Sequence, residues 1–172
     1  AVFRKGVVPK ALLTGGGQER GLRGGSENVL GIAGFGGALA ALDASLAAQP
    51  QVARLRDQTE AAVLSTAPDA VLNGLDVPRL ATTASIAMPG VDAATQVMAM
   101  DLAGIAVSAG AACSSGKVGA SHVLEAMGLR DDIASGTIRV SLGLSTTKAD
   151  IEAFVAAWTA LYMRRNANSS GT

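Results

Sequence analysis

A single cysteine in a segment of small residues is the first feature of this sequence that could carry chemistry. Cys113 is the only cysteine among 172 residues, and it lies in the stretch VSAGAACSSGKVGASHVL, residues 107–124. Small neighbours leave its thiol accessible, and Lys117 can stabilise a thiolate electrostatically. Two interpretations are open from the residues alone: a reactive nucleophile, or a small buried side chain, which is the common state of free cysteine.

Two patterns around this cysteine imitate known motifs. The run GAACSSGK resembles a phosphate-binding P-loop, but Val118 stands where that motif requires Ser or Thr. Ser114-x-x-Lys117 matches one element of the serine β-lactamase signature, whose partner motifs are absent from the sequence. His122 is the only histidine, and we expect it to lie in a first helical turn, although a Cys/His hydrolase pair is the alternative.

Arg139 is the second candidate, because it lies between the apolar residues Ile138 and Val140 in a predicted strand, TIRVSL. A guanidinium is always charged, so an arginine in this setting needs an anionic partner. Its planar fork binds a carboxylate through two parallel hydrogen bonds. The alternative is a structural salt bridge to one of the 14 acidic residues.

Ser26 is the third candidate, in the run Gly-Gly-Ser-Glu-Asn that precedes a predicted helix. Free N–H groups and a hydroxyl at a helix N-terminus suit a phosphate. Ser26 or Asn28 can equally serve as the cap of that helix.

Helices and strands alternate along the sequence, which predicts an α/β or α+β fold. The expected helices cover residues 28–48, 52–64, 92–102, 121–127 and about 147–165, and the expected strands cover 1–13 with a turn at Gly6, 71–72, 82–88, 104–107 and 137–142. The last helix is the clearest, because its apolar residues recur on one face and Thr147 can cap it with Asp150 three residues on.

Composition narrows the class of protein. The 14 basic and 14 acidic residues give a net charge of zero, so nothing steers the chain toward nucleic acid or an anionic membrane. A hydrophobic fraction of 49% excludes disorder. The longest apolar run, residues 29–42, is shorter than the roughly 20 residues that span a bilayer. One cysteine forms no internal disulfide, so we expect a reducing cytoplasm.

Three stretches in this order resemble the cysteine desulfurases of the NifS and IscS type, pyridoxal-phosphate enzymes of the class-V aminotransferase group. They are GGGQERGLRGGSENVLGIAGFGGAL, VSAGAACSSGKVGASHVLEAMGL and TIRVSLGLSTTKADIEAF. The resemblance covers nearly the whole chain. It implies the α+β C-terminal domain of a fold-type I pyridoxal-phosphate transferase. The domain boundaries that it implies are the last strand of the large domain at 1–14, an active-site loop at 15–27, the small domain at 28–165 and a frayed tail at 166–172.

The resemblance also implies roles for the three candidates. Cys113 would take sulfur from L-cysteine as a persulfide and release alanine, and Arg139 would hold the substrate carboxylate. Ser26, where the family usually has Thr, would bind the cofactor phosphate of the partner subunit in a homodimer. A sulfur acceptor or an iron–sulfur scaffold protein would then receive the sulfur.

One part of the family's pattern has no counterpart in this chain. The cofactor-binding lysine is expected in a Ser-x-His-Lys context, and neither Lys5 nor Lys10 has that context. We therefore expect the chain alone to be inactive. Alternatives of another class are a non-catalytic domain that presents Cys113 to sulfur-accepting proteins, or a cysteine hydrolase.

Overall fold

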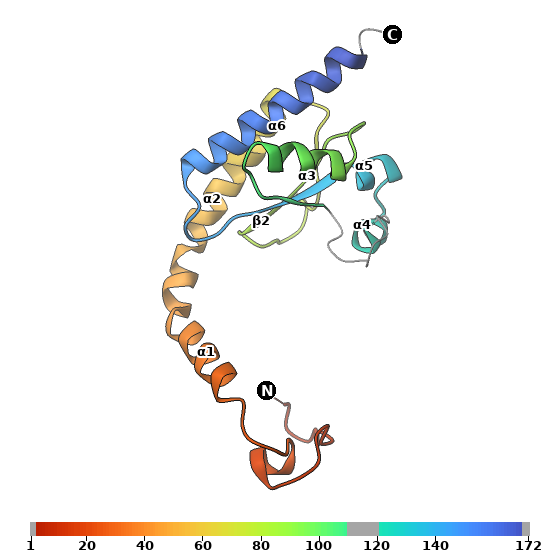
Figure 1. The fold of residues 1–172 in the computed structure, drawn as a ribbon. Coiled ribbons are helices and arrows are strands. Elements are labelled where there is room, and N and C mark those ends of the chain that lie inside the picture. The colour runs from red at the N-terminus through yellow and green to blue at the C-terminus, as the bar shows by residue number, and fades with distance from the viewer. Residues whose placement is uncertain (1–2, 110–120, 170–172) are drawn as a thin grey trace. The chain divides into compact units, whose positions relative to one another are not determined.

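The computed structural model describes residues 3–109 and 121–169 and groups the chain into two compact units, Ala1–Ala44 and Ser45–Thr172 (Figure 1). The boundary expected from the sequence, between residues 27 and 28, falls earlier. The difference arises from helix α1, Val29–Ala40, which buries none of its side chains and so is not grouped with the larger unit.

The first unit holds little regular structure apart from α1. It contains one short 3-10 helix, η1, at Gln18–Gly21. Of the strand, turn and extended chain expected over residues 1–13, the turn at Gly6 is confirmed, with φ +91°. The strand is wrong for the described part, where only an isolated bridge joins Leu13 to Arg23. The Gly24 amide donates to the Leu13 carbonyl at 2.8 Å, which closes the loop between them.

The break between the first two helices is not where the sequence predicts it. Helix α1 ends at Ala40, and α2 runs unbroken from Leu42 to Thr66 with Pro50 inside it. A proline inside a helix removes one hydrogen bond, at a cost of about 3 kcal/mol, and the sequence predicts separate helices at residues 28–48 and 52–64. Helix α2 nevertheless continues past it, because Val52, Leu55 and Val63 further along are buried in the core.

The second unit contains a four-stranded antiparallel sheet of order β1-β2-β4-β3. The strands are β1 Val71–Leu72, β2 Thr83–Ala87, β3 Ser108–Ala109 and β4 Thr137–Ser141, and the remaining helices are α3 Ala93–Leu102, α4 His122–Ala126, α5 Asp131–Ser135 and α6 Lys148–Ser169. The sequence placed β3 at residues 104–107 and missed α5. Gly104 instead ends the turn after α3 with φ +75°, so the strand starts later.

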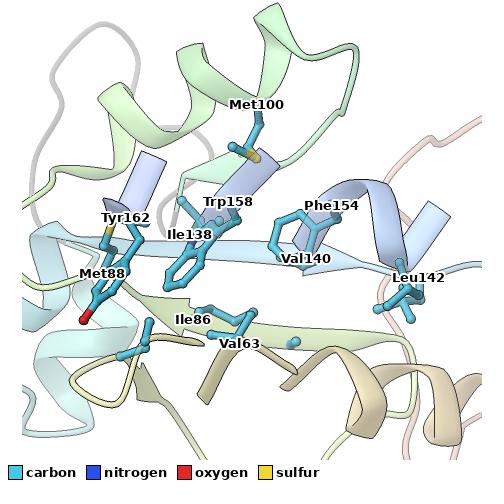
Figure 2. Close-up of a cluster of buried hydrophobic side chains, with 14 of the residues drawn as sticks. Val63, Ile86, Met88, Met100, Ile138, Val140, Leu142, Phe154, Trp158 and Tyr162 are labelled. Atoms are coloured by element: carbon cyan, nitrogen blue, oxygen red, sulfur yellow. The ribbon is translucent and has the colours of Figure 1, made fainter. Parts of the chain in front are cut away.

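The core lies on one face of this sheet. Alternate residues of β2 and β4, Ala84 and Ile86 with Ile138 and Val140, are buried there. Figure 2 shows the side chains from α2, α3 and α6 that meet them; they include Val63, Met100, Phe154, Trp158 and Tyr162. Because side chains alternate along a strand, the residues between the buried ones point to the opposite face.

Helix α6 forms as its sequence predicts at the start and extends further at its end. Thr147 and Asp150 cap it reciprocally: the Thr147 amide donates to Asp150 Oδ2 at 2.8 Å, and the Asp150 amide donates to Thr147 Oγ1 at 3.3 Å. The frayed tail expected from residue 166 is wrong as far as Ser169, which is still helical. Arg165 anchors this end by an ion pair with Asp69 at 2.6 Å.

No described helix is by itself long and apolar enough to cross a membrane. Helices α1 and α2 meet that criterion only as a bent pair, by length and composition alone.

Candidate functional site

Arg139 occupies the middle of β4 on the sheet face opposite the core, and its side chain is exposed. The strand register places Ser85 of β2 directly opposite it on one side and Ser108 of β3 on the other. Its Nη2 donates to Ser108 Oγ at 3.4 Å. The guanidinium therefore lies between two strands that both present hydroxyl groups.

The structural salt bridge considered for Arg139 has no partner in the described structure. All 14 acidic residues of the sequence lie in the described part. None of the ion pairs found there involves Arg139. Its fork is thus available to a carboxylate from outside the chain.

Arg139 lines a cavity of about 380 Å³. Hydroxyl and amide side chains of the sheet form its polar wall, namely Thr83, Ser85 and Asn73. Its apolar wall comes from α4 and from the chain that follows β1, with Val123, Leu124, Met127, Val77 and Leu80. The cavity is large enough for a small amino acid and offers such a ligand both kinds of surface.

A second arginine on this cavity, Arg79, is already paired. Its two terminal nitrogens donate to the two carboxylate oxygens of Glu60 at 2.5 and 2.6 Å. The hydrogen bond to Glu60 raises the pKa of Arg79, while burial opposes that effect. Glu60 is only 4% exposed, so Arg79 neutralises a buried carboxylate. Of the cations that line the described cavity, Arg139 is therefore the one without an acidic partner.

Asn73 and Ser85 are cavity residues that the sequence analysis did not single out. Ser85 alternates with buried residues in the predicted strand 82–88, so its place on the polar face of a strand could have been inferred. The sequence shows Asn73 only as the first residue of an Asn-Gly pair, which is typical of a turn. Its contacts come from chain segments far along the sequence, which no local pattern reveals.

Ser26 lies in the first unit, apart from these residues in the chain, and it is exposed. The Asn28 side chain, not that of Ser26, caps α1 by accepting from the Gly31 amide at 3.1 Å. The hydroxyl of Ser26 makes no hydrogen bond to another described residue, whereas its carbonyl accepts from Arg23. Ser26 is left as a candidate phosphate ligand and is not the helix cap.

Cys113 and Lys117 lie in residues 110–120, outside the described part of the chain. Described residues near both ends of that segment belong to the site: Ser108 contacts Arg139, and Ser121 lines the cavity. His122 begins α4 as expected and is exposed. Within residues 3–109 and 121–169, no group of three or more His, Cys, Asp or Glu could hold a metal ion.

The family model for class-V aminotransferases matches residues 11–154. This match covers most of the chain, so the chain belongs to the class-V aminotransferase family. Within the family it is similar to cysteine desulfurases. It is 39% identical over 150 residues to cysteine desulfurase 2 of Trichormus variabilis. It is 39% identical over 151 residues to the cysteine desulfurase NifS of Azotobacter vinelandii.

Both alignments cover 87% of this chain but only 38% of the relative, so the chain spans well under half the length of the curated relatives that it matches. A NifS-like protein from Rickettsia africae superposes with a TM-score of 0.76 at 36% identity, over 89% of this chain and 40% of that one. A second NifS-like protein gives a TM-score of 0.77 at 32% identity. The predicted fold class, an α+β domain of a fold-type I transferase, is confirmed.

The described residues fit only part of a pyridoxal-phosphate site. The uncommitted hydroxyl of Ser26 suits the cofactor phosphate. No lysine of the chain follows a Ser-x-His sequence. Ser26 is therefore a candidate phosphate contact and Arg139 a candidate carboxylate clamp, and the chain has no lysine in the sequence context expected for the one that binds the cofactor.

Proposed function

We propose that this chain is the C-terminal part of a pyridoxal-phosphate-dependent cysteine desulfurase, which takes sulfur from L-cysteine and releases alanine. The observation that carries the proposal is Arg139: it lies on an inner strand, lines a cavity, and has no acidic partner among the 14 acids of the chain. The similarity to cysteine desulfurases supports the choice of substrate.

Arg139 binds and orients the substrate in this proposal. Two parallel N–H···O bonds hold the α-carboxylate and prevent it from rotating. The hydrogen bond to Ser108 restrains the guanidinium over β3, the strand that leads toward Cys113. Substrate orientation and the approach of the thiol are thus both set from β3 and β4.

Cys113 is the sulfur acceptor. Its thiolate attacks the substrate sulfur, so that an S–S bond forms as the Cβ–S bond of the substrate breaks. The electron pair of the broken bond goes to the three-carbon product, which takes up a proton and leaves as alanine. Pyridoxal phosphate, when bound, acts as the electron sink for this chemistry. The persulfide sulfur then passes to an acceptor protein, for iron–sulfur cluster assembly or another sulfur-transfer pathway.

The remaining parts of the proposal concern assembly and location. Ser26 binds the cofactor phosphate of a second subunit, so the complete protein is a homodimer. A reducing compartment such as the cytoplasm keeps the single thiol available.

The complete protein tests the clamp through Arg139→Lys. Lysine keeps the charge but loses the fork, so we expect kcat/KM for L-cysteine to fall about tenfold to a hundredfold, the equivalent of a charged hydrogen bond of about 1.5–3 kcal/mol. Sulfide or alanine release measures kcat/KM, and thermal melting measured beside it should be nearly unchanged. A large drop in melting temperature with unchanged kinetics per folded molecule would instead show a structural arginine.

Cys113→Ser in the same protein separates the nucleophile from the clamp. We expect persulfide formation to stop while the cofactor and L-cysteine still bind, because the thiol acts after both. Sulfur delivery to an acceptor at a near-normal rate would exclude Cys113 as the nucleophile.

Turnover of cysteine by the isolated 172-residue chain would exclude the proposal that the active enzyme needs residues outside it.

A further inference from the structure

Four polar side chains form a row across the whole sheet on the face that lines the cavity. Asn73 continues β1, and its backbone N–H donates to the Ser85 carbonyl at 2.9 Å. Ser85 is opposite Arg139, and Arg139 is opposite Ser108. Directly opposed residues of neighbouring strands point to the same face, so Asn73, Ser85, Arg139 and Ser108 stand side by side.

The hydrogen bonds at one end of this row have only one consistent direction. Thr137 Oγ1 lies 2.7 Å from the Ile133 carbonyl, which can only accept, so the Thr137 hydroxyl donates there. Thr137 Oγ1 must then accept from Asn73 Nδ2, which is 3.3 Å away. If the Asn73 amide were reversed, its oxygen would face a hydroxyl that has no proton to give.

This direction determines what Ser85 can do. The second N–H of the Asn73 amide donates to Ser85 Oγ at 3.1 Å. Asn73 is 6% exposed, and its Oδ1 is buried without a partner in the described structure, so its amide is held in place by these two donations. Ser85 therefore accepts from Asn73, and its own O–H proton is left to donate elsewhere. Ser85 and Arg139 line the same cavity.

The spacing of the strands suits one carboxylate between Ser85 and the guanidinium. Neighbouring strands are about 4.8 Å apart, so Ser85 and Ser108, two strands apart, are separated by roughly 10 Å. Arg139 Nη2 lies 3.4 Å from Ser108 Oγ, so the guanidinium takes up part of this distance on the β3 side. A carboxylate with a hydrogen bond of about 2.8 Å on each side spans the space that is left.

We propose that Ser85 is a second carboxylate-binding residue of this cavity and that Asn73 is its positioning residue. The Ser85 hydroxyl donates to the same α-carboxylate that Arg139 holds. Asn73 orients this hydroxyl by donating to one lone pair of its oxygen, so that the O–H proton points elsewhere. The ligand class is a small amino acid recognised through its carboxylate. This inference rests on the role of Arg139 in the proposed function and adds a neutral donor that is oriented before the ligand arrives.

The test is a titration of the 172-residue chain with L-alanine, followed by ¹⁵N NMR, with ethylamine as the matched compound that lacks the carboxylate. We expect saturable shifts at Ser85 and at residues 137–140 with L-alanine and none with ethylamine. Ser85→Ala should raise the dissociation constant about tenfold to a hundredfold, as for a lost hydrogen bond to a charged group. Ser85→Thr keeps the hydroxyl and should restore affinity to within about twofold.

Two further variants separate this inference from the proposed function. Ser141→Ala removes an exposed hydroxyl of β4 that does not line the cavity, and it should leave affinity unchanged. Arg139→Lys should weaken binding at least as much as Ser85→Ala. If Arg139→Lys weakens binding and Ser85→Ala does not, the clamp stands and the inference about Ser85 is wrong. If Arg139→Lys has no effect on binding, both are wrong, and a chain that shows no saturable binding overturns the inference about Ser85.

Discussion

At the residue scale, partners decide the role of a polar side chain more than its type does. Gln96 of α3 is fully buried, and each of its polar atoms is satisfied. Its Nε2 donates to the carbonyls of Gly136 at 2.6 Å and Val91 at 3.1 Å, and its Oε1 accepts from Trp158 Nε1 at 3.1 Å. This one amide therefore joins α3, the start of β4 and α6 within the core.

Gln96→Met tests that role, because it keeps the volume and removes the polar partners. Trp158 Nε1 would then be buried without an acceptor, which costs about 1–3 kcal/mol of unfolding free energy. Urea denaturation followed by tryptophan fluorescence measures it. Gln58→Met, at an exposed position of α2, is the control and should change stability by less than about 0.5 kcal/mol. Equal stability of the two variants would show that the amide is dispensable.

At the element scale, the C-terminal part of α6 is held by a polar cluster on the segment that follows α2. Arg165 pairs with Asp69 at 2.6 Å and lies 5.1 Å from the centre of the Tyr162 ring. Burial alone would raise the pKa of Asp69, but hydrogen bonds from Tyr162 and Arg165 hold that pKa below its ordinary value. The cluster explains why α6 continues beyond the point where the sequence predicts fraying.

The lowered pKa of Asp69 makes this anchor dependent on pH. A carboxyl whose pKa is lower in the folded state stabilises the fold above its unfolded pKa of 3.8, and this contribution is lost as the pH falls through the folded value. Asp69→Asn should thus be less stable than wild type at pH 7, and the difference should vanish in acid below the folded pKa.

The expected difference at pH 7 is under about 1 kcal/mol, because Asp69 is partly exposed and solvent screens the pair. Thermal melting between pH 7 and pH 3 measures it. Asp101→Asn, at an exposed carboxylate outside the described ion pairs, is the control and should show no such convergence. A difference that grows toward low pH would contradict the assignment.

At the scale of the whole molecule, the buried apolar residues of the described chain all come after Ala44. They run from Val52 to Tyr162, and the first unit contributes none. Burial of apolar surface is the main source of folding free energy. The second unit should therefore fold without the first.

A truncated chain of residues 45–172 tests this independence. We expect its free energy of unfolding to lie within about 1 kcal/mol of that of the full chain, because it loses no buried apolar side chain. Thermal and urea denaturation of both chains measure the difference. A truncated chain that fails to unfold cooperatively would show that the second unit needs residues 1–44 in order to fold.

Local patterns were sufficient for the parts of this protein that depend on neighbours in the sequence. The face of α6 that buries Phe154 and Trp158 was predicted from its periodicity, and its cap was predicted from Thr147 and Asp150, three residues apart. Strands β2 and β4 were predicted nearly to the residue. Arg139 was predicted to lie mid-strand between apolar residues, and it does, with Ile138 and Val140 buried on the opposite face.

Tertiary structure alone decided the features that depend on which segments meet. Glu60, a residue of α2, pairs with Arg79 and not with Arg139. Its position therefore decides which of the two arginines is left to bind a carboxylate from outside the chain. The row that joins Asn73 and Ser85 to Arg139 exists because β2 pairs with β4 in one register, and a shift by one residue would turn each of these side chains to the other face. Sequence determined the chemical groups and their local elements, and long-range strand pairing determined which groups share a cavity.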